Sequence, residues 1–180
     1  MNHLITYLIL LFGLTGCAQN NIDVIIENYK NCNLTQFNNF EIVPRDGDDE
    51  SQYFMSYYTP LKDTGKGVKV GFPLFDVVFF EKTYFDSMKI SFFIEPLEKS
   101  FFCNKVGIDT SNFEPYIINL FQDFTKLKCK SINFRNGIYI IKNSRYSIVY
   151  LSKYNISHNK KLLSRGYLMY DDDWYYKLEP

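Results

Sequence analysis

Apolar and polar residues alternate with a period of two along several segments of this chain, and this alternation limits the possible folds to those rich in strands. It is clearest over residues 84–95, where every second residue is apolar: Met88, Ile90, Phe92 and Ile94. Such alternation predicts a strand with one buried and one wet face. The 180 residues also include 17 Phe and 15 Tyr, and aromatic residues favour strands. The sequence therefore predicts a sheet-rich protein.

Turn signals divide the chain into nine predicted strands. Their ranges are 40–43, 53–59, 72–81, 84–95, 131–135, 138–142, 146–152, 166–170 and 174–178. The segment 72–81 is apolar on both faces, which is typical of a central strand. Asn136-Gly137 predicts a two-residue hairpin turn, because these residues accept the positive φ angles that such a turn needs. The segments 44–50 and 62–67 are interpreted as an acidic loop and a hairpin turn, since their spacing fits neither a calcium loop nor a phosphate loop.

One segment has the three- and four-residue periodicity of an amphipathic helix, residues 112–128. Its apolar side consists of Phe113, Ile117, Leu120, Phe121, Phe124 and Leu127. We expect this side to pack on the sheet, with a membrane- or partner-binding surface as the alternative. A shorter helix begins at Ile22, although Val24 interrupts its stripe and leaves a strand as a rival. The predicted fold is α+β: an antiparallel, strongly twisted or half-barrel sheet against one main helix and a possible short N-terminal helix.

The N-terminus carries an apolar run from Leu4 to Leu14, followed by Thr15-Gly16-Cys17. The run is shorter than the roughly twenty residues of a membrane-spanning helix and has the layout of a signal peptide. Leu14-Thr15-Gly16-Cys17 resembles the lipobox of bacterial lipoproteins. The absence of Lys and Arg before the run departs from the usual pattern. The resemblance implies removal of residues 1–16 and acylation of Cys17, for example with palmitate.

The resemblance also implies where the mature protein works. Residues 17–21 become a lipidated terminus with a short spacer, and residues 22–180 a single domain held at a membrane of the bacterial cell envelope. Ala18 after the cysteine implies the outer membrane in a Gram-negative host, facing the periplasm or the cell surface. An oxidising compartment allows one disulfide, for which Cys103 and Cys129 are the preferred pair. The alternative is that Cys32, Cys103 and Cys129 are all reduced.

Composition and motifs argue against several classes of function. Twenty basic and twenty acidic side chains give zero net charge, so we expect no nucleic-acid partner. His158 is the only histidine after residue 16, and neither a Gly-x-Ser-x-Gly elbow nor a Cys-x-x-Cys pair is present. The sequence therefore predicts no catalytic residue, no metal site and no cofactor, and it does not indicate the oligomeric state.

The C-terminal segment is the preferred binding surface. Three consecutive aspartates lie among aromatic residues there, and the candidate contacts are Tyr170, Asp171, Asp172, Asp173, Trp174 and Tyr176. Aromatic and acidic residues together suit a basic protein partner, although alternate aromatics could equally belong to the core. The leading hypothesis is a non-enzymatic envelope protein that binds another protein, as an inhibitor or immunity-type factor. A carrier of apolar molecules and a cell-wall hydrolase are the alternatives.

Overall fold

The computed structural model describes residues 22–46, 49–58, 62–63, 69–70, 73–80, 89–152 and 156–179. The chain divides into two compact units, residues 1–34 and 35–180. In the first unit, residues 22–30 form the short helix, so the rival strand interpretation is wrong. The Cys32 thiol donates a hydrogen bond to the backbone oxygen of Asn28, 3.2 Å away, where this helix ends. A single domain over residues 22–180 stays a prediction.

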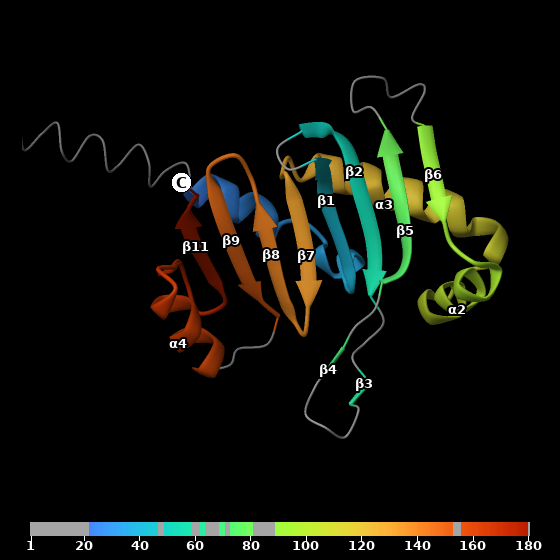
Figure 1. Cartoon of the computed structure of the whole chain (residues 1–180). Coiled ribbons are helices and arrows are strands. Elements are labelled where there is room, and N and C mark those ends of the chain that lie inside the picture. Colours follow the sequence, from blue (N-terminus) through green and yellow to red (C-terminus); the bar gives the residue numbers. More distant parts are fainter. Residues whose placement is uncertain are drawn as a thin grey trace, which may run out of the picture. The chain divides into compact units, whose positions relative to one another are not determined.

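The second unit is built on an open, twisted antiparallel sheet of nine strands (Figure 1). In space the strands follow the order β10-β11-β9-β8-β7-β1-β2-β5-β6. Their bounds are β1 (Phe40–Asp46), β2 (Asp49–Tyr58), β5 (Pro73–Phe80), β6 (Lys89–Phe93), β7 (Ser131–Arg135), β8 (Ile138–Lys142), β9 (Tyr146–Leu151), β10 (Leu168–Met169) and β11 (Trp174–Leu178). A separate hairpin pairs β3 (Lys62–Asp63) with β4 (Lys69–Val70). The predicted α+β class is confirmed.

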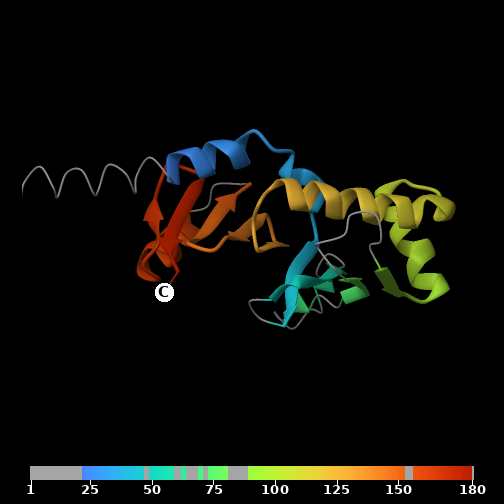
Figure 2. The same cartoon turned by 90° about the horizontal axis from the view of Figure 1, so that it is seen from above.

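Helix α3 (Phe113–Lys126) is the main helix and runs along one face of the sheet (Figure 2). Its predicted apolar side is buried, and two of its rings reach β2. Tyr53 meets Phe121 and Phe124 edge to face, with ring centroids 5.6 and 5.4 Å apart. Edge-to-face aromatic pairs stabilise by about 0.5–1.5 kcal/mol beyond the area they bury. A carrier function would therefore need to displace packed rings between α3 and β2.

The meander β7-β8-β9 follows the predicted register. Ser131 pairs with Lys142 and Arg135 with Ile138, so the turn between the strands consists of Asn136 and Gly137. Both turn residues have positive φ, 55° and 79°, as a tight hairpin of this kind requires. This part of the sheet was predictable because its turn chemistry and its apolar alternation specify the same pairing.

Two helices lie in segments for which the sequence predicted neither a helix nor a strand. Pro96, directly after the predicted strand 84–95, begins α2 (Pro96–Val106). Glu95 and Glu98 form a capping box around the first turn of α2, and Gly107 in the left-handed conformation ends it. The polar segment around His158, between the predicted strands 146–152 and 166–170, forms α4 (Ile156–Ser164).

Smaller corrections concern the ends of elements. The predicted acidic loop 44–50 is shorter, because β1 extends to Asp46 and β2 starts at Asp49. A 3-10 turn, η2 (Thr110–Asn112), precedes α3, and another, η1 (Leu34–Phe37), precedes β1. The carboxylate of Asp109 accepts hydrogen bonds from the Ser111 amide and hydroxyl, and these bonds lower the pKa of Asp109. Side-chain capping thus occurs at η2 and not at the start of α3.

Candidate functional site

The three aspartates predicted as partner contacts form the turn between β10 and β11. One carboxylate oxygen of Asp171 accepts the backbone N–H groups of Asp173 and Trp174, at 3.0 and 2.9 Å. This is the local side-chain-to-backbone bonding that makes Asp common in turns. Asp172 is exposed, whereas Asp171 and Asp173 are half-buried. Of the three, Asp172 is the one whose side chain is exposed to solvent.

Trp174 and Tyr175 are buried, at 4% and 0% exposure. Trp174 stacks on Tyr150 of β9, with ring centroids 4.6 Å apart and planes at 20°. Tyr150 in turn stacks on Tyr139 of β8, and Tyr139 contacts Phe134 of β7. We call these four residues the aromatic row. Trp174 is therefore largely covered by its neighbours in the sheet, and its role as a partner contact stays a prediction.

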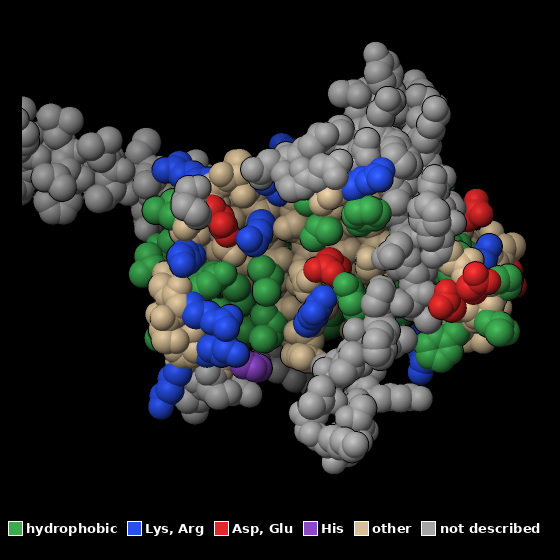
Figure 3. Space-filling model, in the orientation of Figure 1, with side chains coloured by type: hydrophobic (Ala, Val, Ile, Leu, Met, Phe, Trp, Pro, Cys, Tyr) green, Lys and Arg blue, Asp and Glu red, His purple; other side chains and the backbone are tan. Residues whose placement is uncertain are grey.

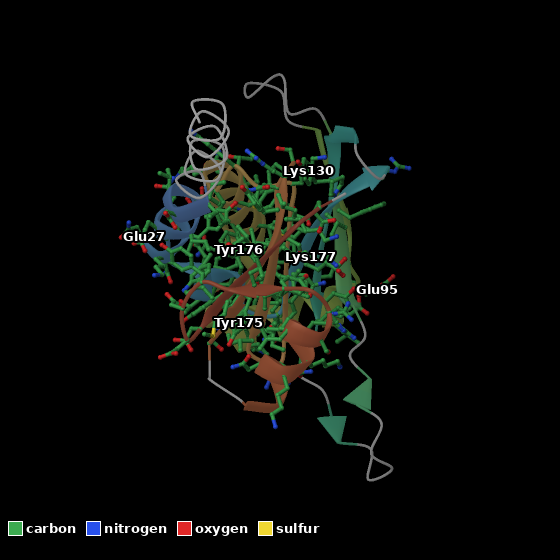
Figure 4. The ribbon with its side chains drawn as sticks, turned by 90° about the vertical axis from the view of Figure 1, so that its left-hand side faces the viewer. Glu27, Glu95, Lys130, Tyr175, Tyr176 and Lys177 are labelled. Carbon is green, nitrogen blue, oxygen red and sulfur yellow. The ribbon has the colours of Figure 1, made fainter. Side chains whose placement is uncertain are left out.

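The exposed apolar side chains lie beside the predicted contacts and were not singled out from the sequence. Leu168 and Leu178 are 58% and 59% exposed, and they flank Tyr176 on one side of the β10–β11 pair. Figure 4 looks onto this end of the sheet, where Tyr175, Tyr176 and Lys177 follow one another along β11. Met169 of β10 and Leu163 of α4 are also about half exposed, but Met169 pairs with Tyr175 and so lies on the other face of the β10–β11 pair. We call Leu168, Tyr176 and Leu178 the terminal edge.

Buried residues lie on the opposite face of β9 and β11, behind the terminal edge. Val149, Leu151 and Tyr175 form a core cluster against which Leu162 of α4 and Tyr167 pack. The Tyr167 hydroxyl is hydrogen-bonded to the Ser147 hydroxyl at 2.9 Å. The Lys177 ammonium donates to the backbone oxygen of Arg165, 3.1 Å away, and ties β11 to the end of α4. Packing and hydrogen bonds from these residues therefore hold β11, which carries Tyr176 and Leu178, in place.

A second group of polar residues lies on the side of the sheet opposite α3, and no local sequence pattern indicated it. Glu41 of β1 accepts hydrogen bonds from the Tyr58 hydroxyl, at 2.6 Å, and from the Asn133 side-chain amide. Arg135 Nη2 lies 3.4 Å from the same carboxylate, and its guanidinium sits 4.5 Å from the centroid of the Tyr58 ring. We call Glu41, Tyr58, Asn133 and Arg135 the Glu41 cluster.

The electrostatics of the Glu41 cluster keep Tyr58 protonated. The pKa of Tyr58 is raised to about 12, first by burial and then by the hydrogen bond to the Glu41 carboxylate and its charge, against an opposing contribution from Arg135. A phenol at such a pKa donates a hydrogen bond at neutral pH and does not act as a base. The cluster is therefore a positioned hydrogen-bonding group that presents Arg135 to solvent.

The two cysteines of the predicted disulfide lie in α2 and at the start of the β7–β8–β9 meander. Cys103 is in α2, and Cys129 precedes β7. Both residues are buried thiols in the structure. Burial raises the pKa of the Cys103 thiol, which makes it less reactive. Their pairing stays a prediction, as does acylation of Cys17, which lies outside the described residues.

Other predicted features can be placed among the residues that the structure describes. Within these ranges, His, Cys, Asp and Glu side chains form no group of three that could hold a metal ion. His158 lies in α4 and is half-buried. In the described part of the chain, no helix is both long enough and apolar enough to cross a membrane.

No protein-family model, no curated protein and no solved structure that was compared with this chain matches it.

Proposed function

We propose that this protein is a lipid-anchored bacterial envelope protein that acts without catalysis by binding another protein. The terminal edge is the binding surface. The proposal rests on one observation above all: Leu168 and Leu178 expose more than half of their area on either side of Tyr176. Apolar side chains grouped around an aromatic ring resemble the centre of a protein interface more than an ordinary wet surface.

Two further features of the terminal edge support binding to a protein. Strand β10 is the last strand of the sheet, so its outer side has no neighbouring strand in the order. Tyr176 is half-buried against Tyr146, with ring centroids 6.2 Å apart, so its ring is held before a partner arrives. Holding an aromatic side chain in place reduces the entropy lost on binding. Exposed Asp172 lies in the adjoining turn and adds a charged contact at the rim.

The anchor places this surface in the cell envelope. A lipid on Cys17 and a spacer of only residues 18–21 would hold the protein close to a membrane. An inhibitor or immunity-type factor is the role that best fits a small anchored protein with a compact binding surface. Mass spectrometry of the native protein tests the anchor directly. We expect a chain that begins at Cys17 and carries fatty acids, and an unmodified Met1 terminus would contradict the anchor.

The binding surface is tested by capture from envelope extract with the purified protein. We expect Leu168→Ser combined with Leu178→Ser to abolish capture of a partner that the unchanged protein retains. Leu97→Ser is the matched control, because Leu97 is 85% exposed but lies on α2. Asp172→Asn should weaken capture by less than the double variant, since rim charges contribute little. Unchanged capture by the double variant would remove the terminal edge from consideration.

A further inference from the structure

The two sides of the central sheet carry charge very differently. On β1, β7, β8 and β11, the side that holds the Glu41 cluster carries Arg45, Arg135, Lys142 and Lys177, as the strand register shows. On the same strands, and up to Glu179 just after β11, the acidic side chains on this side are Glu41 and Glu179. Figure 3 shows this face, with basic side chains around an apolar area over β8 and β9. We call the part of this face from β1 to β11 the open side; Asp76 of β5, which the register places on the same face, lies beyond it.

Both acidic groups of the open side are already engaged. Glu41 contacts Arg135, and Glu179 lies 3.5 Å from the Lys142 ammonium. Glu41 is also only 21% exposed and holds two further donors, from Tyr58 and Asn133. The carboxylate of Glu41 is therefore largely buried, and it orients Tyr58, Asn133 and Arg135. The open side keeps a positive excess, although the whole chain is neutral.

The arginines of the open side are held in place by aromatic rings. The Arg135 guanidinium lies over Tyr58 at 4.5 Å, and the Arg45 guanidinium lies over Phe54 at 5.7 Å. Arg135 is nevertheless 57% exposed. A guanidinium has five N–H donors in a rigid fork, and only one nitrogen of Arg135 approaches Glu41. Stacking on the Tyr58 ring thus fixes the plane of the Arg135 guanidinium and leaves some of its N–H donors available for a carboxylate.

An apolar side chain lies next to these charges. Ile140 of β8 pairs with Asn133 of β7 and is 37% exposed on the open side. A positioned arginine beside an accessible apolar residue has the composition of an interface hot spot. It also differs from a plain lysine patch, whose strongly hydrated ammonium groups attract anions with little geometric selection.

We propose that the open side of the sheet binds an acidic segment of a protein, with a carboxylate on Arg135 and an apolar side chain on Ile140. Charge complementarity favours this partner, because the open side is basic and the Arg135 guanidinium is oriented for bidentate contact with a carboxylate. This inference goes beyond the proposed function, which concerns the terminal edge. The two surfaces are separate, and either can fail without the other.

The experiment measures binding of a synthetic peptide in which Glu alternates with Leu, by fluorescence anisotropy with the full mature chain. We expect Arg135→Gln to raise the Kd about tenfold, since hydrogen bonds between charged groups are the strong ones. Arg135→Lys keeps the charge but loses the fork and much of the stacking, so it should weaken binding by a smaller factor. Amide shifts in an NMR titration should map to β1 and β7.

Matched controls separate this site from general charge and from the terminal edge. Lys126→Gln removes one positive charge from α3, where Lys126 is 75% exposed and paired with Asp123, and should leave the Kd unchanged. Leu168→Ser with Leu178→Ser should bind the peptide as the unchanged protein does. Equal affinity of Arg135→Gln, or equal binding of a Lys-Leu peptide, would overturn the proposal. Binding to phosphatidylglycerol vesicles without binding to the Glu-Leu peptide would overturn it as well, in favour of a membrane.

Discussion

The two sides of the sheet use the same strands for opposite purposes. The side that faces α3 carries Tyr53 and the aromatic row, and its rings contact one another from strand to strand. The open side carries the Glu41 cluster, where a carboxylate, a phenol and a guanidinium satisfy one another. Successive side chains of a strand point to opposite faces, so each strand contributes to both.

The difference between the two sides separates residues that stabilise the fold from residues that are exposed and available for binding. Rings on the α3 side are fixed by packing on several neighbours, so changes there cost stability. Arg135 on the open side contacts Glu41 and the Tyr58 ring among the described residues and remains more than half exposed. Removing it should change binding far more than folding. The predictions below test this contrast, in order of decreasing effect on stability.

Trp174→Ala should have the largest effect, a loss of about 3–5 kcal/mol in the free energy of unfolding, because it removes a buried ring from the aromatic row. Urea denaturation followed by circular dichroism measures the change. Lys142→Ala on the open side is the control and should change stability by less than about 0.5 kcal/mol. Similar losses in the two variants would remove the contrast between the two sides.

Glu41→Ala should cost about 1–3 kcal/mol, because it leaves the Tyr58 hydroxyl and the Asn133 amide without their acceptor. The same denaturation experiment measures this loss. Asp172→Ala, at an exposed carboxylate, should stay within about 0.5 kcal/mol of the unchanged protein. If Glu41→Ala lowers the free energy of unfolding as little as Asp172→Ala does, the Glu41 cluster does not stabilise the open side.

Tyr58→Phe should cost about 0.5–1.5 kcal/mol at neutral pH, since it removes one hydrogen bond and keeps the ring under Arg135. The pKa of Tyr58 is raised to about 12 in the folded protein, above its value of 10.0 when unperturbed. Its contribution to stability is therefore complete below pH 10 and is lost as the pH rises through about 12. Denaturation curves at several pH values measure the difference between the two proteins. A difference that does not shrink between pH 10 and pH 12 would contradict the raised pKa.

Arg135→Gln should have the smallest effect on folding, below about 1 kcal/mol, because partly exposed ion pairs contribute little. The same variant should weaken binding of the acidic peptide about tenfold. Thermal unfolding and anisotropy on one protein preparation give both values. A large loss of stability with unchanged binding would assign Arg135 to the fold and not to a binding surface.

Local signals in the sequence were sufficient for the β7-β8-β9 meander and for α3. Asn136-Gly137 specifies a tight turn, and the apolar alternation on both sides of it specifies the register. The stripe of α3 is strong because all its members face one side. Helix α2 was missed although Glu95, Pro96 and Glu98 mark its start, because its apolar residues form no one-sided stripe: Leu97 and Phe101 are exposed.

The candidate sites likewise divide into features that the sequence predicted and features that only the structure revealed. The sequence by itself identified the aromatic and acidic C-terminal segment, but it could not tell that Trp174 turns inward while Leu168 and Leu178 remain exposed. The Glu41 cluster had no sequence signal at all, since Glu41 and Arg135 are 94 positions apart. They meet because β1 pairs with β7, and the order of strands in a sheet is decided by packing between distant segments. Short-range chemistry thus determined the turns, the strands and the main helix, whereas the exposed and buried roles of individual side chains came only from tertiary contacts.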